Sequence, residues 1–206
     1  MTHTARPIRL PPHQKDRAAE VLAKAFCDDP IMTHVFPERD ERDRSLRRMF
    51  RGSLSHALVY GEVYTTPSID GVACWLSPGR TEFTFWRMLR TGMWMLPFRL
   101  RRGPRRRFFE ILAYMEPIHK RLAPGRHWYL WALGVEPASQ GQGIGSRLIE
   151  PVLARADAEG VACYLETETE QNVVFYQRRG FEVREAGEVR GVRLWMMLRP
   201  AQSRRL

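Results

Sequence analysis

The segment SQGQGIGSRL, residues 139–148, constrains the fold of this chain more than any other stretch. It follows an aromatic and β-branched run at 127–135 that is typical of a strand. After it, Ile144, Leu148, Val152 and Ala156 recur four residues apart, as in an amphipathic helix. Closely spaced glycines let a ligand approach the backbone, and a helix that begins directly behind them offers unpaired N–H groups and a positive dipole end. The segment therefore predicts a strand–loop–helix unit that binds an anion, most often a phosphate.

The spacing of the glycines narrows the choice of phosphate ligand. Gly141, Gly143 and Gly145 form G-x-G-x-G, whereas a dinucleotide-binding fold requires G-x-G-x-x-G early in a βαβ unit. A Walker loop would end in Gly-Lys-Ser/Thr, which is absent here. The loop is therefore predicted to bind neither a nicotinamide dinucleotide nor a nucleoside triphosphate in the usual way.

Composition indicates a globular protein. The chain has 206 residues, of which 44% are hydrophobic and 27% are charged, enough for one domain with a sizeable core. Its net charge of +10 comes almost entirely from arginine, which favours anionic ligands, although an arginine-rich coding sequence would give the same balance. Cys27, Cys74 and Cys163 are far apart in apolar surroundings, so we expect buried free thiols and no metal site.

The sequence also suggests where the protein resides. The N-terminal residues contain no apolar stretch long enough for a signal peptide. The most hydrophobic window, 83–98, is interrupted by Arg87 and Arg90 and is too short to cross a bilayer. We therefore expect a cytoplasmic protein with no membrane partner.

Hydrophobic periodicity predicts a mixed α/β domain spanning residues 1–206. Pro30 is expected to end the first helix, and Pro151 is expected to kink the helix behind the glycine loop. Residues 81–122 interrupt the alternation and predict an insertion of two or more helices with a basic joint at 99–107. The expected strands are 7–10, 62–66, 71–76, 127–135, 161–167 and a closing hairpin at 181–198, and the expected helices lie at about 13–26, 38–58, from 144 and at 170–180.

Two sequence blocks resemble the GNAT N-acetyltransferase superfamily. The first is Gln-x-x-Gly-x-Gly at 140–145, and the second is NVVFYQRRGFEV at 172–183, with a predicted strand between them. Within the superfamily the chain is most similar to puromycin N-acetyltransferase and its relatives, mainly over 127–183 and including Pro151. Many members have an asparagine where this chain has Thr169, and Asn172 supplies an amide three positions later.

The resemblance implies a fold, a cofactor and a binding site. The implied fold is the GNAT fold, a mixed, mostly antiparallel sheet flanked by helices, with the helical insertion before the cofactor-binding strand. The implied cofactor is acetyl-CoA, whose pantetheine arm the strand backbone holds and whose pyrophosphate the glycine loop holds, with Arg147 adding charge. The residues that the resemblance assigns to acetyl-CoA are Leu133, Gly134, Val135, Gln140, Gly141, Gln142, Gly143, Ile144, Gly145, Ser146, Asn172 and Tyr176.

Acetyl transfer to an amine needs an acid for the leaving thiolate and a way to obtain a neutral amine. Tyr176 is the candidate acid, because a phenol of pKa about 10 can protonate a thiolate of pKa about 8.5. The alternative is a core aromatic residue paired with Phe175. Glu166 and Asp29 are the candidate bases; either could instead be a solvated or salt-bridged carboxylate, and a dedicated base could be lacking.

The predicted function is transfer of an acetyl group to the primary amine of a small molecule, for instance an antibiotic or an aminonucleoside. Two alternatives stay open: acetylation of protein N-termini or lysines, and a non-catalytic regulatory module that binds acyl-CoA. Nucleic acid is not an expected partner, because the arginine cluster lacks the interleaved aromatics of a single-strand binder. The aromatic residues of 81–122 are expected to form core or a homodimer face, or else to wall the acceptor pocket.

Overall fold

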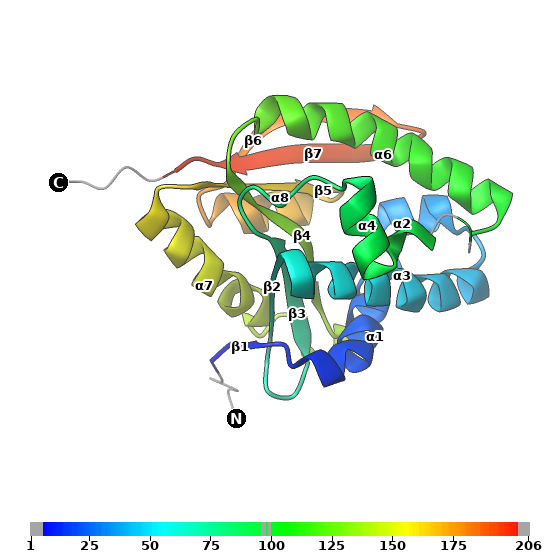
Figure 1. Ribbon diagram of the computed structural model, residues 1–206, viewed down its shortest axis with the longest axis horizontal. Helices are drawn as coiled ribbons and strands as arrows, with labels where there is room; N and C mark the ends of the chain where they lie inside the picture. Colours follow the sequence, from blue (N-terminus) through cyan, green and yellow to red (C-terminus); the bar gives the residue numbers. More distant parts are fainter. Residues whose placement is uncertain (1–5, 96–97, 99, 202–206) are drawn as a thin grey trace.

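The computed structural model describes residues 6–95, 98 and 100–201. Its centre is a seven-stranded sheet in the order β1-β2-β3-β4-β5-β7-β6 (Figure 1). All neighbouring strands pair antiparallel except β4 and β5, which confirms the expected mixed, mostly antiparallel sheet. The strands are β1 (Ile8–Arg9), β2 (Gly61–Thr65), β3 (Gly71–Leu76), β4 (His127–Val135), β5 (Ala162–Thr167), β6 (Glu182–Val189) and β7 (Val192–Arg199).

Helices cover both faces of the sheet, because strand residues alternate between two apolar cores. One core joins Val72, Tyr129 and Tyr164 to helices α1, α2, α3 and α6. The other joins Trp75 and Trp128 to α7 and α8. The helices are α1 (Lys15–Ala25), α2 (Pro30–Val35), α3 (Arg39–Tyr60), α4 (Phe85–Thr91), α6 (Arg102–Leu122), α7 (Ile144–Glu159) and α8 (Glu170–Gln177), with short 3₁₀ turns at Pro12–Gln14, Met93–Met95 and Pro137–Ser139.

Pro30 and Pro151 both lie within helices, and Pro30 has a role that was not expected from the sequence. Pro30 begins α2 instead of only ending the helix before it: it occupies the first helical turn, where its missing N–H costs nothing, and Asp29 caps that turn. Pro151 lies inside α7, and the helix continues through it to Glu159.

The segment expected as an insertion is helical, as predicted, but it differs in two respects. Residues 102–107 of the expected basic joint belong to α6, whose first turn accommodates Pro104; residues 96, 97 and 99 lie outside the described residues. The aromatic stripe does not form core, since the side chains of Phe85, Trp86 and Phe98 are 60%, 75% and 75% exposed.

Candidate active site

The site begins where two parallel strands separate. β4 pairs with β5 only at His127, Trp128 and Tyr129, so the remainder of β4 has no strand partner on its β5 side. Leu133, Gly134 and Val135, the predicted pantetheine strand, lie in this separated part and pair with β3 on their other side. An opening between strands leaves backbone N–H and C=O groups available to an extended ligand.

Gly134 has a packing role as well. A Cβ atom at this position would lie 2.9 Å from the side chains of Leu22 and Ala25. Helix α1 therefore approaches the separated part of β4 closely only because residue 134 is glycine.

The predicted phosphate loop has the backbone that such a cradle requires. Gly141 and Gly143 have φ values of +77° and +72°, in the left-handed region that favours glycine. Gly143 is the residue before α7 and forms no side-chain cap, so the first-turn N–H groups of this 16-residue helix point out of its end. Gln140 Nε2 donates to the carbonyl of Val135 at 3.2 Å and ties the loop to the end of β4.

Three side chains of the predicted loop are already committed to contacts within the protein. Ile144 is 4% exposed and packs in the core, which leaves its backbone as the part available to a ligand. Arg147 Nη1 donates to the carbonyl of Gln142 at 3.1 Å, and the hydroxyl of Ser146 accepts from Arg179.

Arg179, which the sequence reasoning missed, brings a cation to the first turn of α7. Its guanidinium donates to Ser146 Oγ and to the carbonyl of Phe175, and it lies 3.6 Å from the centroid of the Phe175 ring. The signal in the sequence was the Arg-Arg-Gly within the second block, which places arginine just after α8.

Tyr176 is positioned by α8 and is 7% exposed. Its ring contacts those of Phe175 and Phe181, with centroids 5.0 and 5.7 Å away. Burial and the negative charge of Glu168 raise the pKa of the phenol, so it stays protonated. No hydrogen bond holds its hydroxyl within the described part of the chain, which leaves the proton available to a ligand.

Asn172 has a different setting from that of Tyr176. It is exposed, and its backbone N–H donates to Thr169 Oγ1 at 3.2 Å. Thr169 therefore serves as the N-cap of α8, which accounts for a small hydroxyl residue at the position where many relatives carry asparagine.

Three carboxyl groups gather beside the opening. Burial raises the pKa of Glu166 to about 7, although the neighbouring hydroxyls of Tyr129 and Tyr164 oppose that shift. Burial likewise raises the pKa of Asp29 to about 6, and the pKa of Glu168 lies well above its usual range because of burial and of the charge on Asp29. Glu168 was not predicted from the sequence; it follows Glu166 by two positions, the spacing that returns a side chain to the same face of a strand.

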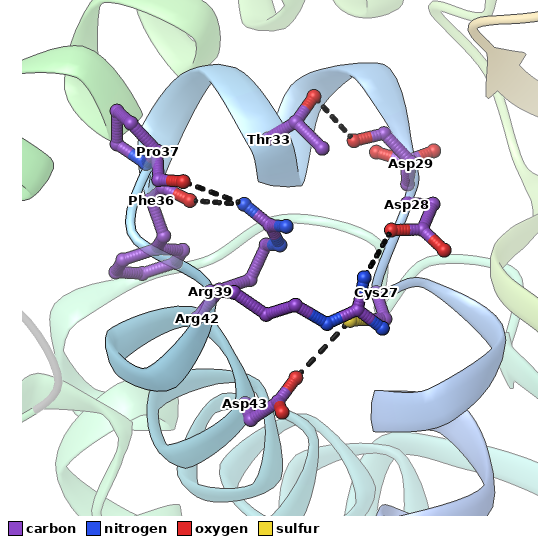
Figure 2. A network of polar contacts seen from close by, with 9 residues as sticks. All are labelled: Cys27, Asp28, Asp29, Thr33, Phe36, Pro37, Arg39, Arg42 and Asp43. Atoms are coloured by element: carbon purple, nitrogen blue, oxygen red, sulfur yellow. Dashed lines mark hydrogen bonds and ion pairs between the residues drawn. The ribbon is translucent and has the colours of Figure 1, made fainter.

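Asp29 is held by a network at the loop between α1 and α2 (Figure 2). Its carboxylate accepts from the Met32 N–H at 3.1 Å, and its carbonyl accepts from Thr33 Oγ1 at 3.0 Å. Arg42 donates to the carbonyls of Phe36 and Pro37 and fixes the far end of α2 (Figure 2). Asp29 thus has a structural role in addition to any role in the site.

Phe83 packs against aromatic side chains of β4 and α3. The Phe83 ring lies 5.0 Å from that of Trp131 on β4 and 5.3 Å from that of His56 on α3. Burial lowers the pKa of His56 to about 4, so this ring is neutral. Of the aromatic residues at 81–98, Phe83 therefore contacts the separated part of β4, whereas Phe85 and Trp86 are far more exposed.

Within the described residues, no group of three or more His, Cys, Asp or Glu side chains is arranged to hold a metal ion. In the same part of the chain, no helix is both long and apolar enough to span a membrane. Cys27, Cys74 and Cys163 are free and buried, as expected.

Sequence comparisons identify the class of protein. The sequence model of the Acetyltransferase (GNAT) family matches residues 106–181. An uncharacterized N-acetyltransferase of Schizosaccharomyces pombe is 30% identical over 171 residues, which covers 80% of this chain and 69% of that protein. The chain belongs to the GNAT acetyltransferase family and is an N-acetyltransferase, and members of this family use acetyl-CoA as the acyl donor.

Solved structures show the same fold at low sequence identity. A histone acetyltransferase HPA2-related acetyltransferase from Corynebacterium glutamicum superposes with a TM-score of 0.68 at 20% identity, covering 98% of this chain and 99% of that one. Arylalkylamine N-acetyltransferase 2 from Aedes aegypti gives 0.64 at 14% identity, covering 97% and 100%. The polyamine N-acetyltransferase of Drosophila melanogaster gives 0.60 at 14% identity, covering 93% and 96%.

Proposed function

We propose that this enzyme transfers the acetyl group of acetyl-CoA to the primary amine of a small, positively charged molecule. The observation that carries the proposal is the group of partly buried carboxyls, Asp29, Glu166 and Glu168, at the opening between β4 and β5. In a chain of net charge +10, such a group favours a cation over an anion at this point. An ammonium that docks there lies beside a carboxylate able to take its proton.

The residues of the glycine loop fit the pyrophosphate of acetyl-CoA. Left-handed glycines at 141 and 143 leave the backbone bare, the first turn of α7 presents its N–H groups, and Arg179 adds a positive charge. The free edge of β4 at Leu133 and Val135 would hold the pantetheine arm. When bound, acetyl-CoA supplies a thioester carbonyl carbon that an amine can attack.

The protein's own groups divide the remaining work. Glu166, with a pKa of about 7, takes a proton from the ammonium, either directly or through a water molecule. Backbone N–H groups of Leu133 or Val135 stabilise negative charge on the carbonyl oxygen. Tyr176 donates its phenolic proton to the departing sulfur, and Asp29 and Glu168 hold the positively charged substrate.

Two finer assignments belong to the same proposal. Residues 1–206 constitute one domain, with 81–122 as an insertion into it; the shared sheet and its two cores support this assignment. The chain stands near the puromycin N-acetyltransferase group, which the retention of Pro151 inside α7 supports. Names of fold relatives add support for an amine acceptor, since one refers to arylalkylamines and another to polyamines.

The test is a screen for thiol release from acetyl-CoA against primary amines, peptides with free N-termini and lysine peptides. We expect turnover with cationic small amines, and turnover of peptides alone would contradict the proposal. In parallel, coenzyme A should raise the melting temperature, because a ligand that binds only the folded state stabilises it, whereas NADH should not. Stabilisation by coenzyme A without turnover of any acceptor would point to a non-catalytic module.

A further inference from the structure

Exposed aromatic side chains are concentrated on one segment of the described chain, from α4 to the start of α6. Trp86 and Phe98 are each 75% exposed, Phe85 is 60% exposed and Trp94 is 38% exposed. Outside 83–112, the large hydrophobic residues that are exposed in the described chain are single aliphatic ones on separate elements: Ile8, Val59, Val174 and Val183. Exposed aromatic residues concentrated in one stretch in this way indicate an interaction surface.

The same segment is strongly basic. Residues 83–109 contain many arginines and neither aspartate nor glutamate. Arg90 and Arg102 are exposed. Arg101 forms an ion pair with Glu41 at 3.8 Å, and Arg106 forms one with Glu110 at 3.6 Å; both glutamates are partly buried. At exposed positions such pairs are weak, so most of the positive charge stays available to a partner.

Described parts of the segment lie against α3, which extends the basic surface. At one end, Arg87 lies over the ring of Tyr60, the last residue of α3. At the other end, Leu100 and Arg101 line a hollow together with Arg44, Ser45 and Arg48 of α3 and with Glu41. Figure 1 shows α4 lying beside α3, with the start of α6 beyond it. The stretch of chain that carries the exposed aromatic side chains thus also contributes, with α3, to a hollow that carries three arginines.

We propose that this aromatic and basic surface docks the enzyme onto anionic phospholipid membranes. Interfacial membrane binding requires tryptophan, phenylalanine and leucine side chains that enter the headgroup boundary and arginines that meet anionic lipid. The hollow between α3 and Arg101 has the charge to accept a lipid phosphate. Docking in the interface plane needs no membrane-spanning helix.

The charge pattern argues against a second copy of the chain as the occupant. Across a two-fold axis two copies of the same surface face each other, so two strongly basic surfaces would be brought together. A single-stranded nucleic acid would need bases stacked on a regular aromatic platform, whereas Phe85 and Trp86 contact each other nearly edge to face, at 70°.

The test is co-sedimentation of the full chain with vesicles of phosphatidylcholine containing 30% phosphatidylglycerol, and with vesicles of pure phosphatidylcholine. We expect binding to the anionic vesicles that weakens as salt is raised and little binding to the neutral ones. Trp86→Ser combined with Phe98→Ser should lower the partition coefficient at least tenfold. Each of Arg90→Gln and Arg102→Gln should lower it about fivefold, the effect of one basic residue near an anionic surface.

Val183→Ser and Arg126→Gln, which change exposed residues outside this surface, serve as matched controls and should bind like the wild type. Melting curves confirm that each variant is folded. The proposal is overturned if the wild type does not bind the anionic vesicles, or if the variants bind as it does. It is also overturned if the wild type is a dimer that Trp86→Ser with Phe98→Ser dissociates, or if an oligonucleotide binds this surface more tightly than the vesicles do.

Discussion

At the scale of single residues, a role of Tyr176 in packing can be distinguished from a role in catalysis. Its ring packs against Phe175 and Phe181, while its hydroxyl is free of hydrogen bonds to the described residues. Tyr176→Phe keeps the ring and removes the proton. We expect kcat to fall by about 10²–10⁴-fold, with near-normal stability and an unchanged affinity for acetyl-CoA.

Tyr64→Phe is the matched control, because Tyr64 is 6% exposed and packs in the same core but lies on β2. It should leave kcat unchanged. Single-turnover rates are the decisive measurement, since slow product release would hide a slower chemical step. A normal single-turnover rate in Tyr176→Phe would leave this tyrosine with a packing role only.

The raised pKa values of the three carboxyls predict how the activity depends on pH. Glu166 has a pKa of about 7, so its basic form grows as the pH rises through neutrality, and kcat/KM should rise with it. In Glu166→Gln that rise near pH 7 should disappear. Activity should then recover only at higher pH, where the free amine is abundant.

Asp29→Asn and Glu168→Gln test the neighbouring carboxyls in the same pH–activity profile. Because these two side chains are proposed to hold the positively charged substrate, both substitutions should raise KM for the amine more than they lower kcat. Glu182→Gln, an exposed position on β6, is the control and should match the wild type. If Glu166→Gln keeps the wild-type pH profile, Glu166 is not the base.

At the scale of elements, the two ends of α7 allow a controlled test of the phosphate cradle. Gly143 before the helix and Gly160 after it have φ values of +72° and +64°. Gly143→Ala and Gly160→Ala therefore impose a similar backbone cost of about 1–2 kcal/mol. Both variants should lower the melting temperature, but only Gly143→Ala should raise KM for acetyl-CoA, by about tenfold or more. Equal KM values in the two variants would place the phosphates elsewhere.

Elements governed by local pattern were predictable from the sequence. The run 127–135 forms β4 with the predicted bounds, and the hairpin of β2 and β3 follows from its turn. The start of α2 at Pro30 was missed, because a proline that ends one helix and one that begins the next look alike in sequence. Arg179 and Glu168 were missed because their importance depends on what lies opposite them in space.

At the scale of the whole molecule, histidines with lowered pKa values and carboxyl groups with raised pKa values determine how the folding stability changes with pH. Burial lowers the pKa of His56 to about 4 and that of His119 to about 3, and it lowers the pKa of His127 as well. Since these histidines bind protons more readily when unfolded, they reduce stability as the pH falls below about 6.5. Asp29, Glu166 and Glu168 have raised pKa values and act in the opposite direction, because their stabilising contribution is largest at low pH and is lost as the pH rises through neutrality.

The contribution of the histidines can be tested separately from that of the carboxyls at the pair of His119 and His127. Their Nε2 atoms are 2.8 Å apart, and His127 Nδ1 donates to the carbonyl of Gly125 at 2.7 Å. The bare Nε2 of His127 must therefore accept from the Nε2–H of His119, an arrangement that requires His127 to be neutral. Protonation of both would break the link between α6 and the start of β4.

His119→Gln tests this arrangement by removing one acid-sensitive group while leaving the carboxyls in place. The variant should be less stable than the wild type at pH 7, because it loses the bond to His127 and the stacking on Tyr164 at 4.2 Å. As the pH falls to 5, His119 is protonated in the unfolded wild type but stays neutral in the folded one, which lowers the stability of the wild type. The variant lacks this histidine, so the difference in unfolding free energy between the two proteins should shrink by about 1–2 kcal/mol. Urea unfolding at both pH values measures it, with the exposed His13→Gln as control. A difference that is the same at pH 5 and pH 7 would show that His119 titrates alike in the folded and unfolded chain.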